Sequence, residues 1–179
     1  MTVAPVLGVL DATGARYALI GAHAMAVRGY PRFTADLDLL TTDRRVLDVS
    51  LWADLQRDGA IVDPRVGDAD DPLAGVVHIQ LADATDIDVV VGRWAWESRL
   101  VERAEPLPLL GAVVPVPHAG DLILLKLAAG GYLDRQDAAA LLATGDRQAL
   151  IRHIDAHIGD VRPDVRAAWH ELLTSVPEA

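Results

Sequence analysis

The sequence predicts an α/β fold with a helical C-terminal part, on three observations. Over residues 1–117, short apolar runs of strand length alternate with segments of helical periodicity. From residue 118 onward every apolar pattern is helical, and glycines or capping aspartates separate the segments. Two of the short runs carry aspartate at every second position, which is the period of a strand. We therefore expect a mixed sheet flanked by helices over residues 1–117 and a helical bundle packed on it over residues 118–179.

The elements of the first third follow from apolar runs and the residues that break them. A glycine turn at Gly21-Ala22 separates a strand from a short helix, and Asp43 can cap a later helix that Gly59 ends. The expected helices are 5–13, 23–28 and 43–57, and the expected strands are 16–20, 35–41 and 60–62.

The remaining elements follow from the same signals. Residues 63–72 are rich in Asp, Gly and Pro and predict an exposed loop. The other expected strands are 75–81, 85–91 and 112–116, the first two close enough to form a hairpin. The other expected helices are 94–104, 121–129, one capped by Asp134, one capped by Asp146, and one with Pro163 in its first turn.

Composition excludes several classes of protein. The chain has 179 residues, no cysteine and a formal net charge of −10. There is no disulfide framework, and no apolar run has membrane-spanning length. A general DNA-binding role is not expected, because phosphate contacts need a basic surface. The N-terminus lacks the features of a signal peptide, so we expect a cytoplasmic protein.

Two acidic strands carry the candidate chemistry. Asp36 and Asp38 alternate with leucines in one expected strand, and Asp86 and Asp88 alternate with apolar residues in another. Alternate side chains of a strand share a face, so each pair of carboxylates points one way. Two neighbouring carboxylates repel each other unless a cation lies between them, and Mg²⁺ prefers such oxygen ligands.

Further candidates surround these strands. Gly21 would allow backbone N–H groups to approach a phosphate closely. Arg32 precedes the acidic strand, and Lys126 is the one lysine in a chain with 15 arginines. Lysine supplies a compact charge on a flexible stem, which suits phosphate contact.

The spacing of these residues resembles a known family. The pattern G-A-x₆-G-x₂-R-x-T-x-D-x-D, and a later K-L segment followed by R-x-D, is similar to nucleotidyltransferases of the DNA polymerase β type, and most closely to the AbiEii-like bacterial group, which includes toxins of toxin–antitoxin pairs. The matching residues are Gly21, Ala22, Gly29, Arg32, Thr34, Asp36, Asp38, Lys126, Arg135 and Asp137. The sequence departs at Ala22, where the family usually has serine or glycine, which removes one hydroxyl contact to phosphate.

The resemblance implies an enzyme that transfers a nucleoside monophosphate from an NTP to a hydroxyl acceptor. Two Mg²⁺ ions about 4 Å apart would serve an in-line displacement. Asp36, Asp38 and Asp88 would hold the metals, with Asp86 as the alternative third carboxylate. Arg32 and Lys126 would offset phosphate charge.

The remaining family residues have supporting roles. Gly21, Ala22 and Thr34 would border the nucleotide, and Asp137 would orient Lys126. The resemblance favours a tRNA end or a protein side chain as acceptor, and it suggests a cognate antitoxin as a partner.

Other functions stay open. Aminoglycoside and lincosamide nucleotidyltransferases share the glycine turn and the Asp-x-Asp pattern, and an acidic surface suits a cationic drug. A catalytically silent module that binds nucleotide or a partner, such as an antitoxin, is a further alternative.

Each candidate also has a purely structural interpretation. Aspartates on strands are often solvated, Lys126 can extend its amine from an amphipathic helix to solvent, and Arg32 and Thr34 can serve only the loop and strand. His153 and His157 lack the pattern of a zinc site.

Overall fold

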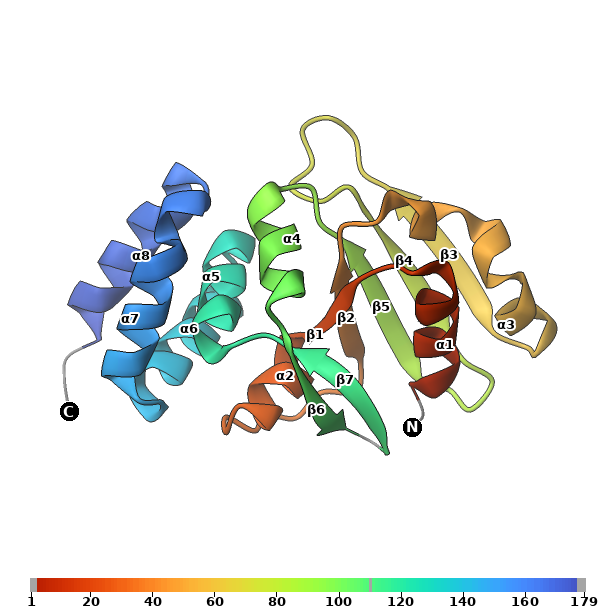
Figure 1. The fold of residues 1–179 in the computed structure, drawn as a ribbon, viewed down its shortest axis with the longest axis horizontal. Coiled ribbons are helices and arrows are strands. Elements are labelled where there is room, and N and C mark those ends of the chain that lie inside the picture. The colour runs from red at the N-terminus through yellow and green to blue at the C-terminus, as the bar shows by residue number, and fades with distance from the viewer. Residues whose placement is uncertain (1–2, 110, 177–179) are drawn as a thin grey trace.

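A five-stranded mixed sheet lies at the centre of the computed structural model, which describes residues 3–109 and 111–176 (Figure 1). The strand order is β1-β2-β5-β4-β3, and only the β2–β5 pair is parallel. A separate two-stranded sheet pairs β6 with β7. The strands are β1 (Tyr17–Ile20), β2 (Leu37–Thr41), β3 (Ile61–Val66), β4 (Gly75–Gln80), β5 (Asp86–Val91), β6 (Glu105–Leu109) and β7 (Ala112–Val116). This is the expected mixed sheet flanked by helices.

The helices divide into two groups. Those of the first group are α1 (Ala4–Thr13), α2 (Gly21–Val27), α3 (Ala53–Arg57) and α4 (Ala95–Glu102), with the 3-10 turns Arg44–Leu47 and Val49–Trp52 before α3. Those of the second are α5 (Ala119–Ala129), α6 (Tyr132–Thr144), α7 (Arg147–His157) and α8 (Pro163–Ser175), with a 3-10 turn at Ile158–Asp160. The second group stands beside the sheet (Figure 1). Where one domain ends and another begins stays a prediction.

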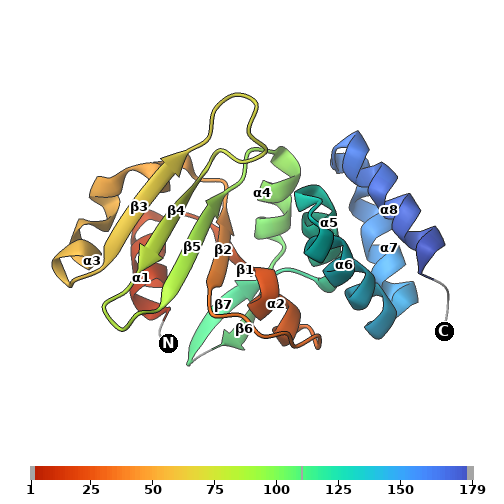
Figure 2. The same cartoon turned by 180° about the vertical axis from the view of Figure 1, so that it is seen from behind.

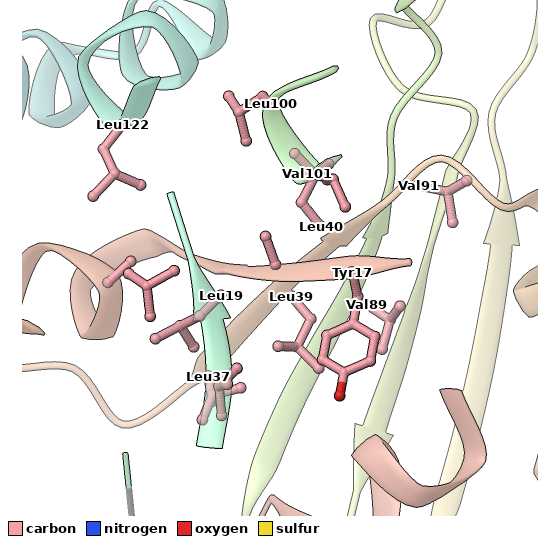
Figure 3. Close-up of a cluster of buried hydrophobic side chains, with 14 of the residues drawn as sticks. Tyr17, Leu19, Leu37, Leu39, Leu40, Val89, Val91, Leu100, Val101 and Leu122 are labelled. Carbon is pink, nitrogen blue, oxygen red and sulfur yellow. The ribbon is translucent and has the colours of Figure 1, made fainter. Parts of the chain in front are cut away.

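The two faces of the sheet differ in what covers them. On one face Leu37, Leu39, Val89 and Val91 are fully buried (Figure 3). Helix α1 lies against this side, whereas Figure 2, seen from behind, shows β3, β4 and β5 without a helix in front of them. Burial of one apolar face fixes the register of the strands, because a shift by one residue would expose it. The alternate residues of β2 and β5 therefore face the side opposite α1, where Asp38 and Asp88 are half-buried and Leu40 is fully buried.

Four sequence expectations need correction. Residues 43–57 form two 3-10 turns and a short helix, because Asp43 and Asp48 each accept a backbone hydrogen bond two residues on. Such local bonds compete with an α-helix. Strand β3 runs to Val66, into the expected loop, because its backbone pairs with β4. Strand β6 contains two prolines and was not predicted, although it pairs fully with β7.

The fourth correction concerns α6, which begins at Tyr132 with Gly131 at its N-cap, so Asp134 lies inside the helix. The other expected caps are confirmed: Asp146 accepts from the backbone of Ala149, and Pro163 opens α8. Within the described ranges no helix is long and apolar enough to cross a membrane.

Candidate functional site

Asp38 and Asp88 face each other across the parallel β2–β5 pair. The register places Asp38 directly beside Asp88. Both residues are half-buried on the face of the sheet opposite α1. Asp36 lies in the bend just before β2 and is exposed. The strand therefore begins two residues later than expected. The carboxylates of Asp36 and Asp38 are therefore not successive members of one strand face.

Gly21 is needed for the position of Asp38. It has a φ of +66°, in the left-handed region, and it begins α2 directly after β1. A Cβ added to Gly21 would lie 1.9 Å from Oδ2 of Asp38. The carboxylate thus occupies the space that any other residue at position 21 would fill. Ala22, by contrast, has a buried side chain, so its contribution at the site comes from its backbone.

The pKa of Asp38 is raised from 3.8 to about 6. Burial is the largest cause, and the charges of Asp88 and Asp36 act in the same direction. The charges of Lys126 and Arg32 oppose the rise without cancelling it. The nearby cations therefore do not offset the cost that burial imposes on the ionised Asp38 carboxylate.

Lys126 projects from α5 between two carboxylates of α6. Its Nζ lies 2.8 Å from Oδ1 of Asp134 and 2.9 Å from Oδ2 of Asp137. Burial disfavours the charged amine, but the hydrogen bonds that the amine donates to these two carboxylates outweigh the effect of burial and raise the pKa of Lys126. Nε of Arg32 lies 3.4 Å from the same Asp137 oxygen. The predicted pairing of Lys126 with Asp137 is present, and Asp134, expected only as a helix cap, is a second partner.

The bend before β2 is held by local hydrogen bonds. The hydroxyl of Thr34 donates to the carbonyl of Asp36 at 3.2 Å, and the amide of Asp36 donates back to that hydroxyl at 3.3 Å. Nδ1 of His23 lies 3.1 Å from the same carbonyl. Thr34 therefore shapes the loop that presents Asp36.

His78 is a neighbour of the site that sequence reasoning missed. It lies opposite Asp88 in the β4–β5 pair, and its Nδ1 is 2.6 Å from Oδ1 of Asp88. Asp86, the alternative third carboxylate, accepts a hydrogen bond from Gln80 at 2.9 Å. Of the two, Asp88 is the one beside Asp38. The only sequence signal for His78 was its place in a strand expected to pair with residues 85–91.

A cleft of about 420 Å³ opens beside Asp88 toward β3. We call it the acidic cleft, because Asp36, Asp63, Asp86 and Asp88 line it together with His78. Arg65 offsets the charge of Asp63 through an ion pair at 3.0 Å. The cleft suits a ligand that is neutral or cationic.

Comparison with solved structures identifies the fold. ANT(2'')-Ia, an antibiotic-resistance factor, aligns with a TM-score of 0.54 and 14% identity over 95% of this chain and 90% of its own. The same protein in complex with adenylyl-2''-tobramycin aligns with a TM-score of 0.53 and 14% identity over 93% of each chain. The chain has the nucleotidyltransferase fold.

An antigenic nucleotidyltransferase-like protein from Paracoccidioides brasiliensis aligns less closely, with a TM-score of 0.49 and 19% identity over 94% of this chain and 90% of its own. No protein-family profile matches the sequence, and no curated protein sequence does either.

The carboxylates of the candidate site are oxygen ligands of the kind that hard cations prefer. Asp38 and Asp88 supply oxygen ligands side by side, and a positive charge beside them would offset the burial that raises the pKa of Asp38. Among the described residues, no three His, Asp or Glu side chains converge closely enough to hold a metal as they stand. Asp36 would have to approach from its bend to complete a set of three. The roles assigned to these residues stay predictions.

Proposed function

We propose that the protein transfers a nucleoside monophosphate from an NTP to a hydroxyl group in a Mg²⁺-dependent reaction. The observation that carries the proposal is the Asp38–Asp88 pair, in register on neighbouring strands and seated against Gly21. Burial raises the pKa of Asp38, and a bound cation would offset that cost of ionisation, which supports a cation as ligand. A carboxylate pair kept for structure alone would be expected to have cationic partners that lower its pKa.

Each residue would have a defined part in the reaction. Bound Mg²⁺ would supply positive charge to the α-phosphate and to the acceptor oxygen. Asp38 and Asp88 would hold it, with Asp36 as the third ligand. Lys126 and Arg32 would face the phosphates, and Asp137 would position both cations. The acceptor oxygen would bond to the α-phosphorus while the bond from this phosphorus to the bridging oxygen breaks, so that pyrophosphate leaves and the proton of the acceptor hydroxyl passes to solvent.

The acidic cleft bears on the acceptor. It adjoins Asp88, where the attacking hydroxyl would lie, and its carboxylates would repel the phosphates of a tRNA end. A cationic small molecule is therefore the acceptor that this surface favours, and a basic segment of a protein is compatible with it. A tRNA acceptor, suggested by the AbiEii-like resemblance, would need its backbone to approach from another side.

The test is transfer of label from each α-³²P-labelled NTP, with Mg²⁺, to three kinds of acceptor: tRNA, lysate protein, and a panel of aminoglycosides and lincosamides. We expect label, and the matching mass increase, on one kind of acceptor. Asp38→Asn should abolish the transfer and weaken binding of Mg-NTP in calorimetry.

Asp86→Asn is the matched control for Mg-NTP affinity, because it removes a carboxylate from the same face of β5 but not from the pair. Transfer is not compared in this variant, since Asp86 lines the acidic cleft. Equal Mg-NTP affinity in the native protein and Asp38→Asn would contradict the metal-bridged site.

A further inference from the structure

Four charged side chains beside the carboxylate pair form a group whose charges cancel, which we call the charge cluster. Lys126 of α5 and Arg32 of the loop before β2 supply its positive charges, and Asp134 and Asp137 of α6 supply its negative ones. Helices α5 and α6 pack side by side (Figure 2), so the cluster joins three segments of the chain. The two cations expected to face the phosphates are therefore already paired within the protein.

Lys126 is the cation of the charge cluster that acts most strongly on the site. Its charge lowers the pKa of Asp38 more than the charge of Arg32 does. Its Nζ also lies 2.8 Å from Asp134 and 2.9 Å from Asp137. A phosphate that approaches Lys126 therefore meets an amine that two carboxylates already neutralise, and these carboxylates repel the phosphate.

The two carboxylates of the charge cluster differ in burial and in partners. The side chain of Asp137 is 8% exposed and pairs with both Lys126 and Arg32, so it holds the two cations together. The side chain of Asp134 is 27% exposed. Among the residues that the structure describes, Lys126 is the only cation with which Asp134 forms an ion pair. Asp134 is therefore the partner of Lys126 that a ligand arriving from solvent can replace.

Asp134 also has a favourable place when it is not paired with Lys126. It lies in the first turn of α6, where the helix amides carry partial positive charge. A Cβ added to Gly131, the N-cap of α6, would lie 2.7 Å from Oδ2 of Asp134. Glycine at this position leaves the carboxylate room beside the helix N-terminus. Asp134 can thus give up its contact with Lys126 and still be stabilised by the helix.

We propose that Asp134 occupies, in the free protein, the place at Lys126 that a phosphate of the bound NTP takes, and that NTP displaces it. This inference rests on the proposed function, and it adds a residue that sets the affinity for the triphosphate. Asp137 keeps Lys126 and Arg32 in position during the exchange. When pyrophosphate leaves, Asp134 returns to Lys126 and favours its release.

The experiment compares phosphate binding with and without the charge of Asp134. The probes are the Mg²⁺ complexes of inorganic tripolyphosphate and of the four NTPs, measured by calorimetry. Asp134→Asn removes the charge and retains the shape of the side chain. Asp155→Asn, at an exposed position of α7 outside the charge cluster, is the matched control, because it changes the net charge by the same amount.

We expect Asp134→Asn to bind tripolyphosphate, and the NTP that binds the native protein best, about tenfold more tightly than the native protein, because the competing anion is gone. Asp155→Asn should stay within about twofold of the native protein, since salt screens an exposed charge. Asp134→Asn should retain the native circular dichroism spectrum. Its affinity for Mn²⁺, which prefers the same oxygen ligands as Mg²⁺, should be that of the native protein, because Asp134 is not expected to be a metal ligand.

A second measurement needs no variant. Lys126 is the only lysine of the chain, so protein labelled with ¹³C-lysine gives one side-chain ε signal in NMR. Binding of tripolyphosphate to the native protein should shift this signal, because a phosphate replaces the Asp134 carboxylate beside the amine.

Equal or weaker affinity for both kinds of probe in folded Asp134→Asn would overturn the role of Asp134 and leave the proposed function standing. A Lys126 signal that does not respond to bound tripolyphosphate would do the same. Failure of the native protein to bind tripolyphosphate and every NTP would instead overturn both.

Discussion

Two aspartates of this protein, one half-buried and one completely buried, have pKa shifts of opposite sign. Asp38, at the candidate site, has its pKa raised to about 6, with burial as the largest cause. Asp121, on α5, is completely buried, yet its pKa is lowered. Burial again acts to raise it, but hydrogen bonds from His153 and Arg103 outweigh that effect. Nε of Arg103 donates to Asp121 at 3.0 Å, and Nε2 of His153 lies 3.2 Å from its Oδ1.

The difference distinguishes a structural carboxylate from a candidate functional one. Asp121 joins α5 to Arg103, just after α4, and to α7, and its charge is satisfied within the chain. Asp38 lies near Lys126 and Arg32, but these cations are engaged by Asp134 and Asp137. A carboxylate whose charge is not satisfied within the chain destabilises the metal-free protein, and a bound cation removes that cost. The following predictions test this contrast.

The largest effect is expected at the structural carboxylate. Arg103→Met would leave Asp121 buried without its main cation, which costs roughly 3–5 kcal/mol of stability. Urea unfolding measures the loss, and Mn²⁺ binding by the folded fraction should be unchanged. Arg99→Met is the control, because its ion pair with Asp160 is exposed on both sides and is worth at most about 1 kcal/mol. Equal losses in the two variants would refute the structural role of Asp121.

Gly21→Ala tests the close approach that seats Asp38. Gly14 provides a matched control, because its φ is +67° and nothing lies within 4 Å of an added Cβ. Gly14→Ala should cost about 1 kcal/mol for the left-handed backbone. Gly21→Ala should cost roughly 3 kcal/mol, because displacement of Asp38 is added to that strain, and it should weaken Mn²⁺ binding at least tenfold. Similar results for both would show that Asp38 can move aside freely.

Asp38→Asn should stabilise the metal-free protein while abolishing metal binding. The pKa of Asp38 is higher in the folded than in the unfolded chain, so its ionisation reduces stability as pH rises from about 4 to about 6. Asparagine removes that penalty, and we expect a gain of about 2 kcal/mol at pH 8 and almost none at about pH 3. Urea unfolding with EDTA at both pH values measures it. Asp86→Asn should change stability by less than about 0.5 kcal/mol, and a destabilised Asp38→Asn protein would contradict the contrast.

The smallest effect is the pH dependence of metal affinity. Protons compete with the cation for Asp38, so Mn²⁺ affinity should fall as pH decreases through about 6. With one titrating group, the affinity at pH 5 should be roughly tenfold lower than at pH 7. Calorimetry at fixed ionic strength measures it. A midpoint near pH 4 would mean that the pKa of Asp38 is not raised in the metal-free protein.

The sequence predicted the elements whose signals are local and regular. The aspartate-bearing run of β5, the hairpin it forms with β4, and the helices opened by Asp146 and Pro163 followed from periodicity and caps. The helix expected at 43–57 was wrong because Asp43 and Asp48 accept local backbone hydrogen bonds that tighten the segment. Strand β6 was missed because two of its five residues are prolines, which are rare in strands. Partners across the fold could not be predicted: His78 for Asp88, Asp134 for Lys126, and Arg103 for Asp121 depend on register and helix packing rather than on spacing along the chain.

Arg28 has a further consequence for how substrates enter. Its guanidinium donates to the carbonyls of Val116 and Pro117 at 2.8 and 2.7 Å, and it pairs with Glu105 at 3.0 Å. The connection from β7 to α5 is thereby fastened to the end of α2, so we expect this connection to be rigid. The segment at 67–74 is held in a similar way, because Arg93 donates to the carbonyls of Ala69 and Leu73 at 2.7 and 3.1 Å. We therefore expect substrates to enter between elements that keep a constant relation to each other.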